Sequence, residues 1–190
     1  MPRAGLSHDI VVHEAADVAD VTGWEHLSLA AVAARFGVKL PSLYKHISWL
    51  DGLRRDVAVL ATRELGATLS AAAVGRAGGD ALRAVAEAYR GFGRAHPGRY
   101  AATVRSPAAG DGEHLAAAGS VLRVVLAVLA GYGLNGDDAV DATRAVRAGL
   151  HGFVTLEAGG GFGMPQDVDR SFRRMVDALD DTMTAWVSVG

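Results

Sequence analysis

The sequence predicts an all-α protein, and two observations lead to this expectation. Apolar residues recur at spacings of three and four along most of the chain, which is the period of an amphipathic helix. No segment alternates apolar and polar residues in the way that a half-buried strand does. Half of the 190 residues are hydrophobic and 21% are charged, so the chain has enough apolar material for a packed core. We therefore expect a globular protein of about nine helices.

The first three expected helices are short and follow one another closely. The first begins at Ser7 and stops before Gly23. The second follows Ser28, whose hydroxyl can cap the N-terminal amides, and ends at Gly37. The third has Pro41 in its first turn, where a missing N–H costs nothing, and lasts about two turns. Two short helices joined by a tight turn have the dimensions of a helix-turn-helix, which places its second helix in the major groove of DNA.

Longer helices are expected after this N-terminal group. Ser48 and Asp51 have the spacing of a capping box, which predicts a long helix that runs to about Ser70. Segments containing Gly or Pro then separate five further helices, at about 80–95, 98–105, 113–133, 137–158 and 167–188. The helix at 113–133 is apolar on nearly every side, so we expect the rest of its domain to surround it.

The composition narrows the possible functions. The chain has no cysteine, which excludes disulfides and thiolate zinc sites and is consistent with a cytoplasmic location. The first residues lack the apolar run of a signal peptide. The longest mostly apolar stretch, around 121–134, is shorter than the roughly 20 residues that a bilayer crossing needs, so we expect no membrane partner. The net charge of −2 gives no overall basic signature, so DNA binding has to be argued from local residues.

The third short helix carries side chains that suit DNA. Lys45 can neutralise a phosphate, and Tyr44 and His46 can hydrogen-bond to phosphate oxygens. The entry end of such a helix is where side chains reach base edges, and it holds Lys39, Leu40, Pro41 and Ser42. The stretch 27–55 contains five basic residues and one acidic residue, which is a local charge of +4 in an acidic protein.

The string LSLAAVAARFGVKLPSLYKHISWLDGL at 27–53 resembles the DNA-binding domain of TetR-family regulators. The residues that match the family's framework are Leu27, Ser28, Val32, Ala33, Gly37, Val38, Leu43, Tyr44, His46 and Leu53. The resemblance implies a DNA-binding domain at 1–55, in which Ser28 joins the candidate contacts named above. Two positions depart from the pattern, because Ala30 and Leu50 stand where relatives carry an Arg and a Lys that contact DNA.

The segment RAVRAGLHGFVTLE at 144–157, with the sequence that follows it, resembles the C-terminal domain of a TetR subgroup named for a Trp-His-Gly signature. His151 and Gly152 match, and Arg147 or a neighbour stands at the Trp position. The resemblance implies a ligand-binding and dimerisation domain at 56–190, whose last two long helices pair with those of a second copy. The candidate interface is an apolar stripe on these helices: Leu150, Phe153, Val154, Phe172, Met175, Val176, Leu179 and Met183.

The same resemblance implies a sensor cavity among the helices between about 48 and 158. Its candidate lining is Tyr89, Phe92, Tyr100, Leu122, Leu126, His151 and Thr155. Apolar walls with a few polar groups suit an uncharged or weakly polar ligand. The same side chains would serve equally well in ordinary helix packing, so both interpretations stay open.

The expected function is a ligand-responsive regulator without a cofactor. The resemblance implies a repressor that binds a palindromic operator as a homodimer and is released by a small hydrophobic effector. The alternative is a sensor or adaptor with a degenerate helix-turn-helix, which Ala30, Leu50 and the acidic overall charge favour.

Neither an enzyme nor a metal site is expected. Ser106 and His114 could belong to a catalytic triad in principle, but no nucleophile elbow surrounds them. The glycine-rich stretch 159–163 follows no strand and precedes no Lys-Ser or Lys-Thr pair, so it is expected to be a turn. His8 and His13 lack the His-Glu-x-x-His spacing of a zinc site.

Overall fold

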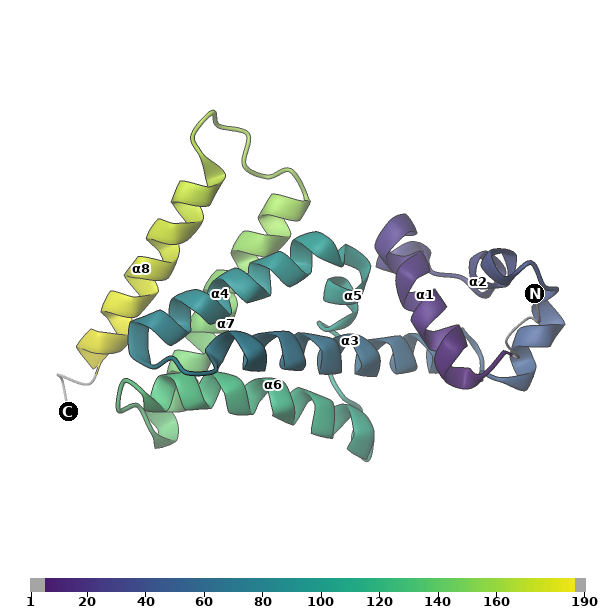
Figure 1. Ribbon diagram of the computed structural model, residues 1–190, viewed down its shortest axis with the longest axis horizontal. Coiled ribbons are helices and arrows are strands. Elements are labelled where there is room, and N and C mark those ends of the chain that lie inside the picture. Colours follow the sequence, from purple (N-terminus) through teal and green to yellow (C-terminus); the bar gives the residue numbers. More distant parts are fainter. Residues whose placement is uncertain (1–5, 187–190) are drawn as a thin grey trace. The chain divides into compact units, whose positions relative to one another are not determined.

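The computed structural model describes residues 6–186, and every regular element in that range is helical (Figure 1). The elements are α1 (His8–Thr22), η1 (Trp24–His26), α2 (Leu29–Phe36), η2 (Leu40–Lys45), α3 (Leu50–Ala73), α4 (Gly78–Ala95), α5 (Pro97–Ala102), α6 (Gly112–Ala130), α7 (Gly136–Ala158) and α8 (Val168–Trp186), where η marks a 3₁₀ helix. The predicted all-α class is confirmed.

The chain divides into two compact units. The first is Met1–Glu64 with His96–Ala118, and the second is Leu65–Ala95 with Gly119–Gly190. Helices α3 and α6 each contribute residues to both units. This division differs from the functional boundary expected near residue 55, because α5 and the start of α6 pack with the N-terminal helices.

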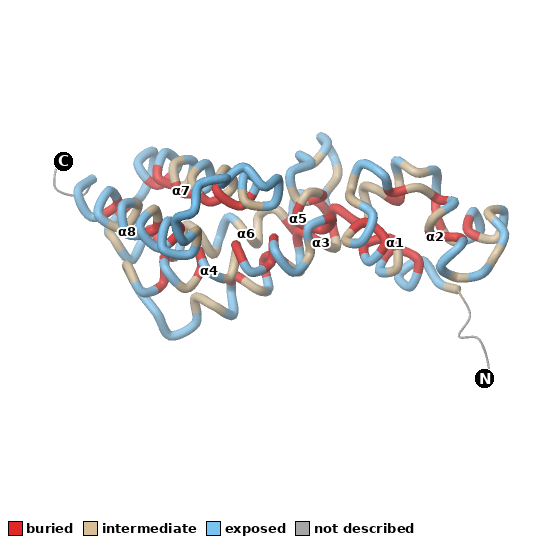
Figure 2. The backbone as a smooth tube through the Cα atoms, turned by 90° about the horizontal axis from the view of Figure 1, so that it is seen from above, coloured by how far each residue is buried: buried red, intermediate tan, exposed pale blue. Residues whose placement is uncertain are grey.

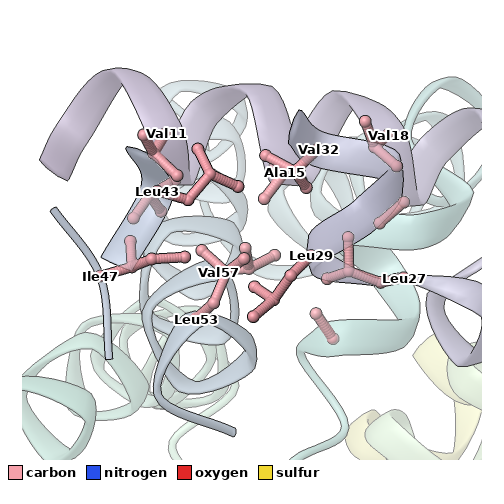
Figure 3. Close-up of a cluster of buried hydrophobic side chains, with 14 of the residues drawn as sticks. Val11, Ala15, Val18, Leu27, Leu29, Val32, Leu43, Ile47, Leu53 and Val57 are labelled. Carbon is pink, nitrogen blue, oxygen red and sulfur yellow. The ribbon is translucent and has the colours of Figure 1, made fainter. Parts of the chain in front are cut away.

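The core of the first unit is shared by four short or partial helices (Figure 3). Its fully buried side chains include Val11 and Ala15 from α1, Val32 from α2, Leu43 from η2, and Leu53 and Val57 from α3. Each full burial of a Val or Leu side chain contributes about 1.5–3 kcal/mol. Helices of this length are marginal in isolation, so the shared core is what fixes η2 relative to α2 and α3.

The predicted cap at Ser28 is confirmed, the structure adds a cap at Ser7, and the start of the long helix is shifted. The Ser7 hydroxyl accepts from the N–H of Ile10, and the Ser28 hydroxyl accepts from the N–H of Ala31. Helix α3 begins at Leu50, and its first hydrogen bond runs to the carbonyl of Trp49. The expected capping box at Ser48 is therefore wrong by one residue, which is the usual uncertainty of helix ends.

Helix α5 is tied to the N-terminal helices by one arginine. The Arg99 guanidinium, nearly buried, contacts the carboxylates of Asp17, Asp20 and Glu64. The backbone N–H of Arg99 also donates to Asp20 across 2.8 Å. Beside it, Gly98 lies so close to α1 that an added Cβ would be 2.1 Å from the backbone carbon of Ala19. These contacts explain why α5 belongs to the first unit.

The core of the second unit lies among α4, α7 and α8, and it includes a buried cation. The Arg90 side chain is 3% exposed and donates to Glu157 and Asp169. Its guanidinium lies 4.5 Å from the ring centre of Phe172, which in turn contacts Phe153 edge-on. Arg90 on α4 therefore joins the end of α7 to the start of α8.

Helix α6 is less buried than its sequence predicts. Leu115 and Leu122 are 50% and 44% exposed, and Figure 2 shows long stretches of α6 outside the buried class. The expectation that its domain surrounds it is wrong, because an apolar circumference does not specify how many neighbours a helix has. By length and apolar composition α6 could cross a bilayer. Core helices of soluble proteins share this length and composition, so these two properties do not assign α6 to a membrane.

Candidate DNA-binding site

The turn between α2 and η2 depends on one glycine. Gly37 has a φ of +64°, a left-handed conformation that favours glycine. Its N–H donates to the carbonyl of Ala34, and the N–H of Val38 donates to the carbonyl of Ala33. These bonds end α2 and redirect the chain within three residues, so that η2 can begin at Leu40.

The recognition element is a 3₁₀ helix, whereas the sequence predicted an α-helix. Pro41 occupies its first turn, and the N–H of Ser42 donates to the carbonyl of Lys39 across 2.9 Å. A six-residue helix can form few backbone hydrogen bonds, and Pro41 has no N–H to donate. The hydrogen bonds of a 3₁₀ helix span three residues, so its turns close within this short length. Side chains three apart are eclipsed in a 3₁₀ helix. This geometry places Pro41 with Tyr44 and Ser42 with Lys45.

The structure brings the predicted contacts together on η2 and its flanks. Lys39, Pro41, Tyr44 and Lys45 are exposed, whereas Leu40, Ser42 and His46 are partly exposed. Leu43, between them, is fully buried. Ser28, at the start of α2, is also partly exposed, but its hydroxyl already caps that helix. One side of η2 is therefore fixed in the core, and the other sides can reach a ligand.

Most of the basic residues in the stretch 27–55 are used within the protein. Arg35 pairs with Glu14 across 2.6 Å, and Arg54 donates to the carbonyls of residues 25 and 27. Arg55 pairs with Asp56, Asp111 and Glu113, and its hydrogen bond holds the pKa of the Asp111 carboxyl well below its usual range. Within the part of the chain that the structure describes, the Lys39 and Lys45 side chains of this stretch form no ion pair or hydrogen bond with another residue.

Sequence reasoning missed one exposed aromatic residue at this site. Trp49, just before α3, is 74% exposed, and its ring lies 5.3 Å from that of Tyr44 at an angle of 58°. Tyr44 itself is 42% exposed. The sequence did hold a sign of this residue's role, because a bulky indole stands at the start of a helix, where small capping residues are preferred.

The predicted ligand-lining residues do not form one cluster within either unit. Tyr100 is buried in the first unit, whereas the other members belong to the second. Among these, Phe92 is buried, Tyr89, Leu126 and His151 are partly exposed, and Leu122 and Thr155 are exposed. The cavity therefore stays a prediction.

The predicted dimer stripe is mostly intramolecular core. Leu150, Phe153, Val154, Phe172, Val176 and Met183 are buried within the second unit, so these six side chains face the core of their own chain, and their role in a dimer interface stays a prediction. The period of an apolar stripe marks a buried face but does not say whether the same chain buries it. Met175 and Leu179 are partly exposed, and their side chains approach Gly149 of α7.

The described residues contain no candidate metal site. Between positions 6 and 186 no group of three or more His, Asp or Glu side chains is arranged to hold a metal ion. His8 instead pairs with Asp56 across 2.9 Å, and this hydrogen bond raises the pKa of His8. His13 bonds to the backbone carbonyl of Asp9.

Comparison with known proteins identifies the family. The family model described as the tetracyclin repressor-like C-terminal domain matches residues 82–179. An uncharacterised HTH-type transcriptional regulator of Mycobacterium tuberculosis is 40% identical over 167 residues, which cover 87% of this chain and 75% of that protein. Another from Bacillus subtilis is 33% identical over 168 residues, covering 88% and 87%.

A solved structure with the same fold is that of a TetR variant from Acinetobacter baumannii in complex with minocycline. It has a TM-score of 0.71 and 20% identity, covering 96% of this chain and 98% of that one. At this identity the likeness concerns the fold alone. The resemblance to the Trp-His-Gly subgroup stays a prediction. The family model and the two sequence relatives together establish that the chain belongs to the TetR family of helix-turn-helix transcriptional regulators and is not an enzyme.

Proposed function

We propose that this regulator is a repressor that binds a palindromic operator as a homodimer and is released by a small hydrophobic effector. The observation that carries the proposal is the geometry of η2. Leu43 fixes this element in the core, while Tyr44 and Lys45 next to it face outward. A scaffold that holds a polar, cationic edge in a fixed position is what major-groove recognition requires.

Each outward residue has a proposed role. Lys45 neutralises a phosphate, and Tyr44 donates a hydrogen bond to a phosphate oxygen, so these two position the protein. Pro41 and Ser42 lie at the entry end of η2, where Ser42 can hydrogen-bond to a base edge and Pro41 can contact a thymine methyl. Lys39, exposed just before η2, adds a second cation.

The second subunit is proposed to pack on the outward face of α7 and α8. Ala148 and Ala178 are exposed on these helices, and a Cβ added at Gly152 would meet open space. Small exposed side chains allow the helices of two subunits to approach closely. A two-fold axis then presents two recognition elements to two half-sites, which is why the operator is proposed to be palindromic.

Effector control is proposed to act through α3. Four residues separate the end of η2 from the start of this helix, which continues without a break to Ala73 in the second unit. A displacement of its C-terminal end would therefore change the spacing of the two recognition elements. The effector must prefer the non-binding state by about 5.5 kcal/mol to reverse a 99:1 population. The Acinetobacter protein, which has the same fold, forms a complex with minocycline, so a fold of this kind can hold a small molecule.

The test is selection of bound sequences from a random DNA pool, carried out in parallel with a Tyr44→Ala, Lys45→Ala double variant. We expect a palindromic consensus with the wild-type protein and none with the variant. A reporter gene behind that consensus should then be repressed in cells that make the protein. Activation of the reporter would contradict repression while leaving DNA binding intact.

The second candidate is a sensor or adaptor that does not bind DNA. The internal pairing of Arg35 and Arg55 favours it, because these cations are then not available to phosphates. Leu50 also places an apolar side chain where relatives carry a Lys. Absence of any enrichment at low salt, with a folded wild-type protein, would support this candidate over the repressor. In either case we propose that the protein acts in the cytoplasm.

A further inference from the structure

Trp49 is not explained by the stability of the fold. It stands directly before α3, and its carbonyl accepts the first hydrogen bond of that helix, from the N–H of Leu53. Side chains preferred at this position accept a hydrogen bond from the first turn, but an indole N–H only donates. With 74% of its surface exposed, the indole also gains little from burial. Such departures from local preference are expected mainly at functional sites.

The indole is nevertheless held in a defined place. Its ring packs against that of Tyr44, with the centres 5.3 Å apart. Tyr44, Lys45 and Trp49 therefore form one exposed surface, which we call the aromatic edge. A preordered side chain loses little entropy when it binds.

The chemistry of the aromatic edge suits the sugar-phosphate backbone of DNA. An indole offers one N–H donor for a phosphate oxygen and an apolar face for a deoxyribose. The side chain of Leu50, the next residue, has neither a charge nor a hydrogen-bond donor. The Trp49 side chain forms no hydrogen bond with any residue between positions 6 and 186. The N–H is thus available for an external acceptor.

We propose that Trp49 is a DNA-backbone contact, whose indole N–H donates to a phosphate that flanks the bases read by η2. The inference rests on the proposed function, since it requires that the protein bind DNA. The contact is neutral and independent of base sequence. It positions the protein on the duplex, and it supplies at this point a hydrogen bond in place of an ion pair.

The test measures operator affinity as a function of salt for Trp49→Ala, Trp49→Phe and Lys45→Ala. We expect Trp49→Ala to raise the dissociation constant about tenfold per subunit, and so about a hundredfold for the proposed dimer, as for loss of a hydrogen bond to a charged group. Because no charge is removed, its salt slope should equal that of the wild type. Lys45→Ala should lower the slope by about one per subunit. Trp49→Phe keeps the ring pair with Tyr44 but loses the donor, so it should also weaken binding.

Trp186 provides the matched control. It is an exposed tryptophan in the second unit, and Trp186→Ala should leave operator affinity unchanged. Indole fluorescence supplies a second readout. In a Trp24→Phe, Trp186→Phe background, which leaves Trp49 as the one tryptophan of the sequence, operator binding should change the emission, and adding Trp49→Phe should abolish that change. Thermal unfolding of each variant separates lost contact from lost fold.

Three results would overturn the inference. Wild-type affinity in Trp49→Ala and Trp49→Phe would mean that the indole does not touch DNA. A reduced salt slope in Trp49→Ala would mean that it acts by positioning Lys45. A wild-type chain without affinity for any DNA would overturn the proposed function as well, whereas the first two results leave that function intact.

Discussion

At the scale of single residues, the close approach of α5 to α1 depends on a glycine. Gly98 leaves no room for a side chain, since its added Cβ would be 2.1 Å from a backbone carbon and 2.2 Å from the carbonyl oxygen of Ala19. Backbone cannot move aside as the end of a flexible side chain can. The ion pairs of Arg99 would therefore be strained together with the helix.

We expect Gly98→Ala to reduce the free energy of unfolding by about 3 kcal/mol, the upper part of the range for overpacking. Gly91, exposed in α4 with nothing within 4 Å of its added Cβ, is the control. Gly91→Ala should be neutral or slightly stabilising, because alanine is the better helix former. Urea denaturation measures both, and equal stability of the two variants would contradict the close approach.

The buried Arg90 makes the second unit sensitive to acid. Its hydrogen bond holds the pKa of the Glu157 carboxyl below the usual value. A carboxyl with a lowered folded pKa stabilises the protein above its unfolded pKa, about 4.3, and loses this contribution as pH falls further. Removing the charge would leave Arg90 with Asp169 as its remaining acidic partner.

We therefore expect Glu157→Gln to be destabilising at pH 7 by about 1–3 kcal/mol, as for a charged hydrogen-bond partner lost from a largely buried site. The difference from wild type should shrink progressively below about pH 4.3. Unfolding curves between pH 7 and pH 3 measure it. A difference that stays constant over that range would show that the carboxylate charge does not contribute.

At the scale of elements, η2 separates stability from recognition within two adjacent residues. Leu43 is fully buried, whereas Tyr44 is exposed. The sequence predicted this recognition element and the turn before it, because Gly37 ends α2 and Pro41 lies in the first turn of η2. It did not predict the 3₁₀ geometry, since that follows from the short span between α2 and α3 that the core imposes.

We expect Leu43→Ala to cost about 2–5 kcal/mol of stability and to weaken operator binding, because η2 loses its anchor. Tyr44→Ala should weaken binding with stability within about 0.5 kcal/mol of wild type. Chemical denaturation and operator titration of the pair measure both effects. Loss of stability in the tyrosine variant equal to that in the leucine variant would place Tyr44 in the core.

At the scale of the whole molecule, the exposed charges of α8 give the proposed dimer a defined register. Arg174 and Asp181 are exposed, lie two helical turns apart, and form no ion pair with any residue between positions 6 and 186. Two α8 helices packed antiparallel about Ala178 would set each Arg174 against the other copy's Asp181. Charge complementarity of this kind fixes register more than it adds affinity.

We expect Arg174→Glu alone to raise the dimer dissociation constant about tenfold, because it creates two like-charge contacts. Adding Asp181→Arg should restore the wild-type value by exchanging the charges. Sedimentation equilibrium at low and high salt measures this. A double variant that dimerises no better than the single one would exclude the antiparallel register.

The sequence by itself determined the helices, the helix-turn-helix and its outward residues, because periodicity, caps and glycine turns are local properties of the chain. Only the tertiary structure decided which faces meet. Arg99 binds α5 to the first unit, the α7 and α8 stripe is buried in its own chain, α6 stays partly exposed, and Trp49 joins Tyr44. An amphipathic pattern records that a face is apolar, and it carries no information on the partner that covers it.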